Sequence, residues 1–474
     1  MTGSRVAVVG AGYSGLAAGY ELARHDLPCA VFESAPVAGG LASCFRLGHT
    51  WLEKYYHHWF THDHDVLTLI GELGLDRHLI RRETTTGSFY ANRVYRLSSP
   101  LDVLRLKPLT MVDRLRLGRM VLRARSIDDY RSLEGRTARQ WITDLSSKAV
   151  YDVVWRPLFE GKFGRYADRV SAVWFWSKLR TRGESRSRRQ REELLYLDGG
   201  LHRLTRALCT AITDAGGDLR LNCPVLKVRR TGGAWQVVTR DGSESFDHVV
   251  LTTPLPISLD LLDDLPEDCR RRAEAIPYLG VTALVLVMHR RLSPAYWLNV
   301  NDPTYPFVGV IEHTNFQSPE AYGGRHIVYL TKYHDESHET CRMDHQALFD
   351  AWRKHLERMF PAFEESWVDL SLCWRDPYAQ PVVLSGSERH VLPVETPLPG
   401  VWMCSMAQVY PQDRGMNYAV RLGRLTGQRV LAAVGVRAVP HRIVRISPAS
   451  PAPPAQKERA ALQPVAALQG LSPA

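Results

Sequence analysis

The stretch Arg5–Gly15, RVAVVGAGYSG, lies near the start of the chain and decides the fold. A short β-branched run ends in three glycines, Gly10, Gly12 and Gly15, and an apolar segment typical of a helix follows. Gly10 permits a tight turn, Gly12 lets a pyrophosphate approach the backbone, and Gly15 lets the helix pack close to the strand. The stretch therefore predicts a strand, a glycine turn and a helix that together bind a dinucleotide.

The residues after this turn support the same interpretation. Tyr13 and Ser14 open the helix, whose N-terminus presents N–H groups and the positive end of its dipole to phosphates. A second β-type run, Cys29–Phe32, ends in Glu33, where a carboxylate can accept hydrogen bonds from both ribose hydroxyls of an adenosine. This order predicts an α/β fold built on a Rossmann-like domain.

The composition is that of a globular protein. The chain has 474 residues, 45% hydrophobic and 23% charged, with a net charge of +10. A basic chain can bind nucleic acid, an anionic membrane surface or a phosphorylated substrate, but no nucleic-acid recognition module accompanies the basic residues. Eight cysteines without a CxxC pair indicate reduced thiols. With no signal-like or membrane-spanning run, we expect a cytoplasmic protein.

The next motif selects the cofactor. Gly39-Gly40-Leu41 comes six residues after Glu33. This spacing resembles the FAD-binding opening of the flavin amine oxidase superfamily, which includes amine oxidases, protoporphyrinogen oxidase, carotenoid desaturases and, more distantly, UDP-galactopyranose mutase. The resemblance implies FAD as the cofactor, with the Gly-Gly turn near the flavin side of the pyrophosphate. No second GxGxxG is present, which argues against enzymes that bind FAD and NAD(P)H in separate domains.

Two later segments carry the same resemblance. Leu197–Leu201, LDGGL, precedes a helix, two strands and the run Asp247–Pro254. This looks like the second half of the family's FAD domain and implies cofactor contacts at Val225 and Thr253.

The other segment is Gly400–Arg421, which reads as a strand, a glycine turn and a helix. The resemblance implies that the N-terminus of this helix points at the flavin ring and ribityl chain. Asp413 would accept a ribityl hydroxyl, and Met416 and Asn417 would offer backbone N–H groups to the flavin. A positive helix end beside the ring favours the anionic reduced form.

These motifs predict a discontinuous FAD-binding domain at 1–95, 195–255 and 395–437. A helical insert at 96–194 and a sheet-containing insert at 256–394 would form an α+β substrate domain. The β-type runs of the second insert are Val281–Met288, Phe307–Ile311 and His326–Lys332. The tail, 444–474, is rich in proline and alanine and is expected to be disordered.

Two arginine-rich stretches lie in the helical insert. Thr110–Asp113 is typical of a helix start, and the helix after it alternates apolar residues with five arginines. Such a helix can be a solvated surface helix or can lie on an anionic membrane, which would make the protein peripheral to the inner face of the membrane. Arg180–Arg191 can be a surface loop or a clamp for a phosphate or carboxylate of an anionic substrate.

The chemistry implied by a flavin is hydride removal from a small-molecule substrate. A dehydrogenase, oxidase or desaturase must hold the donor carbon over the ring, exclude water and manage one proton. Lys332, at the end of a predicted strand, is a candidate for that proton, although a surface lysine is the simpler interpretation. Tyr410 is expected to line the pocket, and Arg414 to meet the flavin or an anionic substrate. The alternative is non-redox flavin catalysis of the sugar-nucleotide mutase type.

A histidine cluster lies in Glu53–Asp65, EKYYHHWFTHDHD. A zinc site needs three or four converging ligands, and we predict no metal here. The segment KYYHHWF is similar to the mutase pattern Lys-Tyr-Gly-x-His-x-Phe, which implies that His58, with His57 beside it, lies against the flavin. The second half of the cluster is expected to begin a helix, with Asp63 or Asp65 as its cap.

Overall fold

A five-stranded parallel sheet forms the centre of the FAD-binding half of the molecule, in the order β10-β2-β1-β14-β20. The structure is a computed structural model that describes residues 4–90, 92–95, 109–184 and 192–439. The strands are β1 (Val6–Val9), β2 (Cys29–Phe32), β10 (Asp218–Arg220), β14 (His248–Leu251) and β20 (Val401–Met403). The α/β class predicted from the sequence is confirmed, and three separate segments of the chain build one sheet.

Three helices pack together beside this sheet: α1 (Tyr13–Ala23), α9 (Leu201–Asp214) and α13 (Met416–Ala433). The contact between α1 and α13 is unusually close. A Cβ at Gly423 would lie 2.2 Å from the backbone oxygen of Ser14, and one at Gly427 would lie 2.7 Å from Cβ of Glu21. Glycine at these two positions of α13 therefore allows α13 to lie against α1.

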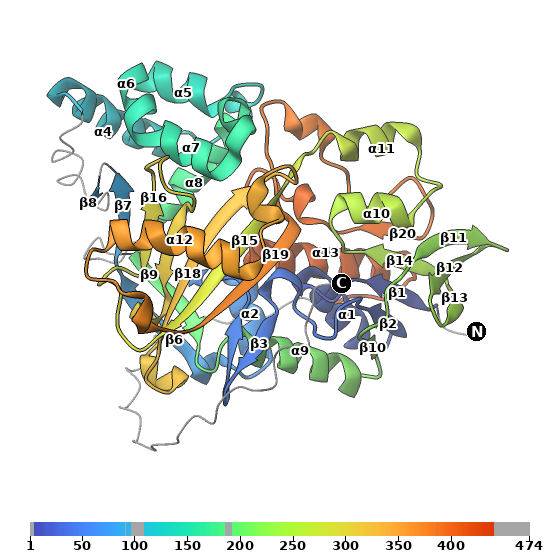
Figure 1. Ribbon diagram of the computed structural model, residues 1–474. Coiled ribbons are helices and arrows are strands. Elements are labelled where there is room, and N and C mark those ends of the chain that lie inside the picture. The colour runs from blue at the N-terminus through green and yellow to red at the C-terminus, as the bar shows by residue number, and fades with distance from the viewer. Residues whose placement is uncertain (1–3, 91, 96–108, 185–191, 440–474) are drawn as a thin grey trace.

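A second, seven-stranded sheet lies beside the first (Figure 1), in the order β19-β15-β18-β17-β16-β7-β8. Its strands are β7 (Thr86–Tyr90), β8 (Arg93–Tyr95), β15 (Tyr278–Met288), β16 (Trp297–Val300), β17 (Gly309–Glu312), β18 (His326–His334) and β19 (Val368–Pro381). The runs predicted in the second insert are antiparallel strands here. Thr86–Tyr90 and Arg93–Tyr95, which we assigned to the FAD domain, instead pair within this sheet.

The helical insert packs as a separate cluster at the top of Figure 1. Its helices are α4 (Met111–Arg125), α5 (Ala138–Leu145), α6 (Lys148–Val150), α7 (Arg156–Phe163) and α8 (Ala172–Glu184). Thr110 caps α4 as predicted, because its hydroxyl accepts from the backbone N–H of Asp113. The arginine stretch after residue 184, like the tail at 444–474, lies outside the described residues.

Among the described residues, three small sheets and four further α-helices accompany these elements. The sheets are β3 (Cys44–Leu47) with β4 (Thr50–Glu53); β5 (Trp59–Phe60), β9 (Glu192–Leu197) and β6 (Leu79–Thr84); and β11 (Lys227–Thr231), β12 (Ala234–Thr239) and β13 (Gly242–Phe246). The helices are α2 (His64–Glu72), α10 (Leu255–Leu261), α11 (Glu267–Glu274) and α12 (His345–Met359). All eight cysteines are free thiols. Within the described ranges, no helix has the length and apolarity needed to cross a bilayer.

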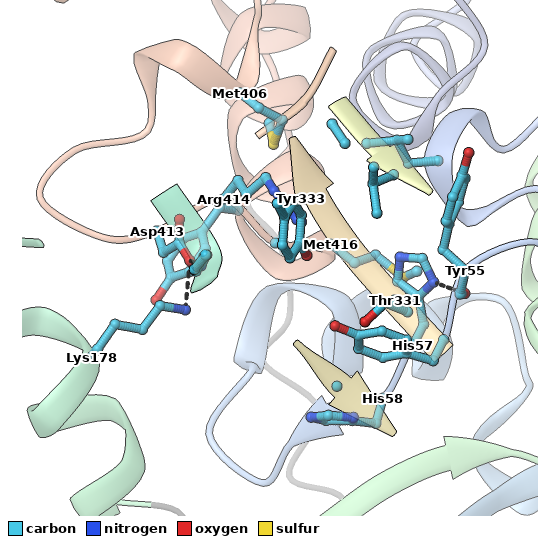
Figure 2. Close-up of a pocket in the computed structure, with 18 of the residues that line it drawn as sticks. Tyr55, His57, His58, Lys178, Thr331, Tyr333, Met406, Asp413, Arg414 and Met416 are labelled. Atoms are coloured by element: carbon cyan, nitrogen blue, oxygen red, sulfur yellow. Dashed lines mark hydrogen bonds and ion pairs between the residues drawn. The ribbon is translucent and has the colours of Figure 1, made fainter. Parts of the chain in front are cut away.

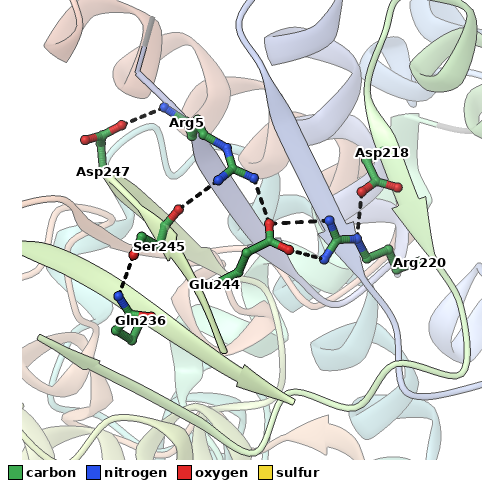
Figure 3. A network of polar contacts seen from close by, with 7 residues as sticks. All are labelled: Arg5, Asp218, Arg220, Gln236, Glu244, Ser245 and Asp247. Atoms are coloured by element: carbon green, nitrogen blue, oxygen red, sulfur yellow. Dashed lines mark hydrogen bonds and ion pairs between the residues drawn. The ribbon is translucent and has the colours of Figure 1, made fainter. Parts of the chain in front are cut away.

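A polar network joins the β11–β13 sheet to the parallel sheet (Figure 3). The carboxylate of Glu244 on β13 accepts from Arg5 at 2.7 Å and from Arg220 on β10 at 2.9 Å. Hydrogen bonding from Arg220 and Arg5 lowers the pKa of Glu244, although partial burial opposes this. These contacts hold the β11–β13 sheet beside β10, the edge strand of the parallel sheet.

Candidate functional site

A cavity of about 600 Å³ lies where the parallel sheet, the large sheet and the helical insert meet. Its walls come from all three parts, as Figure 2 shows for a subset of the lining residues. The FAD-binding half contributes the first glycine turn, the Gly-Gly turn, the segment from Tyr55 to Phe60 and the start of α13. Trp297, Thr331 and Tyr333 come from the large sheet, and Trp155, Lys162 and Lys178 from the helical insert.

Two glycine turns pack against each other at one end of this cavity. Gly10, Gly39 and Gly40 have φ angles of +104°, +117° and +58°, in the region that favours glycine. The N–H of Gly39 donates to the carbonyl of Ala11 at 2.8 Å, and a Cβ at Gly40 would lie 3.1 Å from Cα of Gly12. Side chains are thus excluded from the place where the sequence predicts the pyrophosphate.

Gly15 has the packing role predicted for it. A Cβ at Gly15 would lie 1.8 Å from the carbonyl oxygen of Gly10, which is far inside contact distance. The first turn of α1 is therefore held directly over the end of β1.

Two helices begin at the cavity without a side-chain cap from the described residues. They are α1, after Gly12, and α13, after Gly415, and both starts line the cavity. A helix N-terminus without a cap leaves N–H donors for an external acceptor, and its dipole favours negative charge there. The start of α1 suits a pyrophosphate and the start of α13 suits a flavin ring, so these parts of the cavity fit FAD. The predicted cofactor residues that line the cavity are Gly12, Tyr13, Ser14, Gly39 and Leu41 near α1, and Asp413, Met416 and Asn417 near α13.

The remaining predicted cofactor residues lie outside the described cavity lining. Glu33 directly follows β2, and its carboxylate accepts from the N–H groups of Ala11 at 2.8 Å and Ala35 at 2.9 Å. These hydrogen bonds hold the Glu33 carboxylate beside the first glycine turn. The Thr253 hydroxyl pairs with that of Ser258 at 2.7 Å, and Val225 packs beside the core around Phe246. The structure brings neither of these two residues to the cavity.

His57 lies on the cavity wall with a defined tautomer. Its Nδ1 is 2.7 Å from the carbonyl oxygen of Tyr55, so Nδ1 carries the proton and Nε2 is left as an acceptor. Burial lowers the pKa of His57 to about 4, and the nearby Arg414 adds to this effect, although the hydrogen bond to Tyr55 opposes it. His57 is therefore a neutral imidazole at physiological pH.

His58 also lies at the cavity wall (Figure 2), and its ring packs in an aromatic corner. Its Nδ1 is 3.0 Å from the hydroxyl of Tyr296, and the rings of Phe60, Tyr296 and Trp297 lie edge-on at 5.5, 5.8 and 5.8 Å. The two adjacent histidines thus both line the cavity, but in different surroundings.

A charged cluster lies at the opposite wall, next to the start of α13. Asp413 is 7% exposed, and its carboxylate contacts Lys178 at 2.7 Å, Lys162 at 3.3 Å and Gln380 at 3.1 Å. Burial alone would raise its pKa, but the two lysines and Arg414 outweigh burial and hold the pKa of Asp413 well below its usual range. Asp413 is therefore an anion that ties the helical insert to α13.

Arg414 adjoins this cluster and lies within the cavity. Its guanidinium donates to the hydroxyl of Tyr333 at 2.8 Å. Burial opposes its charge, but Tyr333 and Asp413 favour it, and the net effect raises the pKa of Arg414. The side chain is therefore a permanent cation beside the start of α13.

Two predicted catalytic residues are not at the cavity. On β18, Thr331 and Tyr333 line it, so Lys332 between them points to the other face of the sheet. The hydroxyl of Tyr410 lies 3.2 Å from a carboxylate oxygen of Glu134, and its ring packs against Tyr130 of the helical insert. Proton transfer by Lys332 and a cavity wall at Tyr410 have no support in this geometry.

The second half of the histidine cluster begins α2, as predicted, but the cap differs. The Asp63 carboxylate accepts from the N–H of Phe60 at 2.8 Å rather than from the helix, and the side chain of Asn417 accepts from the N–H of Val66 at 3.1 Å. The start of α13 thereby caps α2. In the part of the chain that the structure describes, no group of three metal-binding side chains converges.

Sequence reasoning missed Lys162, Lys178, Tyr296, Trp297 and Tyr333. Each lies in an insert without a short motif, and each reaches the cavity through contacts between distant segments. The alternation along β18 was the one available signal, because it places Tyr333 on the face opposite Lys332.

The parallel sheet and the glycine turns at the cavity are the features expected of a dinucleotide-binding protein. The sequence matches the family described as flavin containing amine oxidoreductase over residues 13–431, and the chain belongs to that family. This family description agrees with the FAD-dependent oxidoreductase class that the sequence motifs predicted.

Individual relatives agree with this placement. The mitochondrial protoporphyrinogen oxidase of Nicotiana tabacum is 28% identical over 302 residues, which are 53% of this chain and 58% of the tobacco protein. The chain therefore matches little more than half the length of that relative.

Two solved structures share the fold. A protein of Exiguobacterium sp. with a provisional assignment as protoporphyrinogen oxidase gives a TM-score of 0.74 at 18% identity, covering 91% of this chain and 100% of that one. A reduced UDP-galactopyranose mutase gives 0.71 at 14% identity, covering 92% and 98%. At such identities the likeness concerns the fold alone.

Proposed function

We propose that this protein oxidises a small, largely apolar substrate that carries an acidic group. The observation that carries the proposal is the cavity, which has an aromatic corner at one side and a cationic cluster at the other. Bound FAD would accept a hydride at N5. The chain's own tasks are to orient the substrate, exclude water and receive one proton.

The aromatic corner suits the apolar part of the substrate. Tyr296 is 1% exposed and Trp297 packs edge-on against Tyr56 at 4.6 Å, so the wall is rigid and poor in water. His57 supports the proton step because the Tyr55 carbonyl fixes its proton on Nδ1 and leaves Nε2 as the acceptor.

The cationic cluster suits the acidic group. Lys162, Lys178 and Arg414 gather around the single carboxylate of Asp413. The other two acids of the described lining, Asp63 and Asp376, accept from backbone N–H groups, and burial raises the pKa of both. An anionic substrate group is favoured beside the three cations.

The test is an anaerobic titration of the holoenzyme. A porphyrinogen with free carboxylates should bleach the visible absorbance of the oxidised flavin in a stoichiometric way. Its methyl ester should react more slowly, and an aliphatic diamine should not react. Preference for the ester or the diamine would refute the acidic-group proposal, and failure of every organic reductant to bleach the flavin would refute net oxidation.

The second candidate is isomerisation of the sugar-nucleotide mutase type, favoured by the sequence KYYHHWF and by the fold shared with the mutase. It would need a clamp for a diphosphate, and Arg414 is the one arginine among the described lining residues. Turnover of a sugar nucleotide to an isomer only after chemical reduction of the flavin would establish this candidate instead.

A further inference from the structure

Helix α4 carries a surface that neither the fold nor the cavity uses. Ten large hydrophobic side chains are exposed among the described residues, and four of them lie on this helix: Met111, Val112, Leu115 and Leu122, with exposures of 57%, 57%, 62% and 66%. Exposed apolar residues are normally scattered singly over a surface. Their concentration on one helix therefore indicates a surface that binds a partner.

The helical repeat sorts the side chains of α4 into faces. Leu117, Met120 and Ala124 are buried against the insert, at most 3% exposed. Met111, Leu115 and Leu122 follow the i, i+4, i+11 spacing, so they form one stripe on the outer side.

Arginines border this stripe on both sides. By the same repeat, Arg116, Arg119 and Arg123 lie along one flank, and Arg114 and Arg125 along the other. The one acid of the helix, Asp113, is 8% exposed and is hydrogen-bonded to Thr110 and Ser147. It also lies 3.6 Å from Arg116, so it offsets the charge of that one arginine. The outer side of α4 is therefore apolar in the middle and positively charged at its margins.

We propose that α4 docks the protein on the surface of a bilayer that contains anionic phospholipids. The apolar stripe enters the boundary between headgroups and acyl chains, and the arginines keep their charges among the phosphates. A convex helix with charges along both margins suits a flat anionic surface. The inference is independent of which substrate the cavity oxidises.

The position of α4 agrees with this role. It lies at the outer end of the helical insert in Figure 1, far from β11 and the parallel sheet. The same insert lines the cavity through α7 and α8. Docking would thus leave the FAD-binding half of the molecule clear of the bilayer.

The experiment is sedimentation of the FAD-loaded protein with two kinds of vesicle, phosphatidylcholine alone and phosphatidylcholine mixed equally with phosphatidylglycerol. We expect binding to the mixed vesicles, weakened by salt. The variant Leu115→Glu/Leu122→Glu should lower the partition coefficient about tenfold or more. Arg119→Gln/Arg123→Gln should lower it by about fivefold for each arginine and reduce the salt dependence.

The matched control is Leu226→Glu, at another exposed leucine, 47% exposed. Leu226 directly precedes β11, and β11 lies far from α4 in Figure 1. The Leu226→Glu variant should bind vesicles like the parent protein. Binding to neither vesicle, or equal binding of the parent and the Leu115→Glu/Leu122→Glu variant, would overturn the proposal. A parent dimer that this variant converts to monomer, without vesicle binding, would overturn it in favour of a second copy of the chain.

Discussion

At the scale of single residues, His57 and His58 differ although they are neighbours in sequence. The Tyr55 carbonyl fixes the tautomer of His57, and burial keeps the ring neutral, whereas His58 pairs with the hydroxyl of Tyr296. We expect His57→Ala to slow flavin reduction by about 100-fold, within the usual range for a lost proton acceptor. Stopped-flow anaerobic reduction measures this rate.

The control for this prediction is His64→Ala, because His64 is exposed on the first turn of α2. It should leave the rate unchanged. Equal losses at both positions would mean that the rate reports folding rather than proton transfer.

Glu21 provides a prediction about pH. Its side chain is fully buried on α1, and burial raises its pKa to about 7 even though Arg424 and Arg24 act in the opposite direction. An acid whose pKa is higher in the folded than in the unfolded state stabilises the fold at low pH and loses that contribution as pH rises. From about pH 4.5 to 7, Glu21 should therefore contribute a fall of about 2–3 kcal/mol to the stability measured by urea unfolding. Glu21→Gln should remove this contribution, so stability should fall less steeply with pH in the variant than in the parent, and an unchanged slope would contradict the assignment.

At the scale of elements, the close packing of α1 and α13 links folding to cofactor binding. Both helix N-termini face the cavity, and Gly423 lets the helices approach, since a Cβ there would lie 2.2 Å from the Ser14 oxygen. Gly423→Ala should lower the free energy of unfolding by about 3 kcal/mol through overpacking, measured by denaturant titration. It should also lower the fraction of protein that purifies with FAD.

The matched substitution is Gly118→Ala on α4, where a Cβ would meet nothing within 4 Å. It should raise stability by up to about 1 kcal/mol, because alanine is the better helix former. Destabilisation at both sites would show that the effect does not come from the contact between α1 and α13.

The helices, strands and turns also show how much of this structure could be predicted from the sequence. The glycine turns and β-type runs were predictable because each depends on residues adjacent in the chain. The cap of α2 was not, since Asn417 comes from a segment far away in sequence. Lys332 and Tyr410 were predicted from their position in the sequence alone. Strand alternation turns Lys332 away from the cavity, and Tyr410 packs on the helical insert.

At the scale of the whole molecule, FAD is expected to act as a structural component. The parallel sheet draws strands from three segments, and its cavity is closed by both inserts. A ligand that binds only the folded state stabilises it by about 2.7 kcal/mol at a concentration of 100 times its Kd. Adding FAD to the apoprotein should therefore shift the denaturant midpoint upward, by an amount that grows with FAD concentration.

A comparison of FMN with FAD tests the two ends of the site one at a time, because FMN has the flavin but lacks the adenosine half. The paired glycine turns and the turn held by Glu33 are the features that suit the pyrophosphate and the adenosine. FMN should therefore stabilise the apoprotein much less than FAD at the same concentration, measured by the same midpoint. Equal stabilisation would mean that the Gly10–Gly15 turn contributes little to binding, and the dinucleotide assignment would then have to rest on the α13 end of the cavity alone.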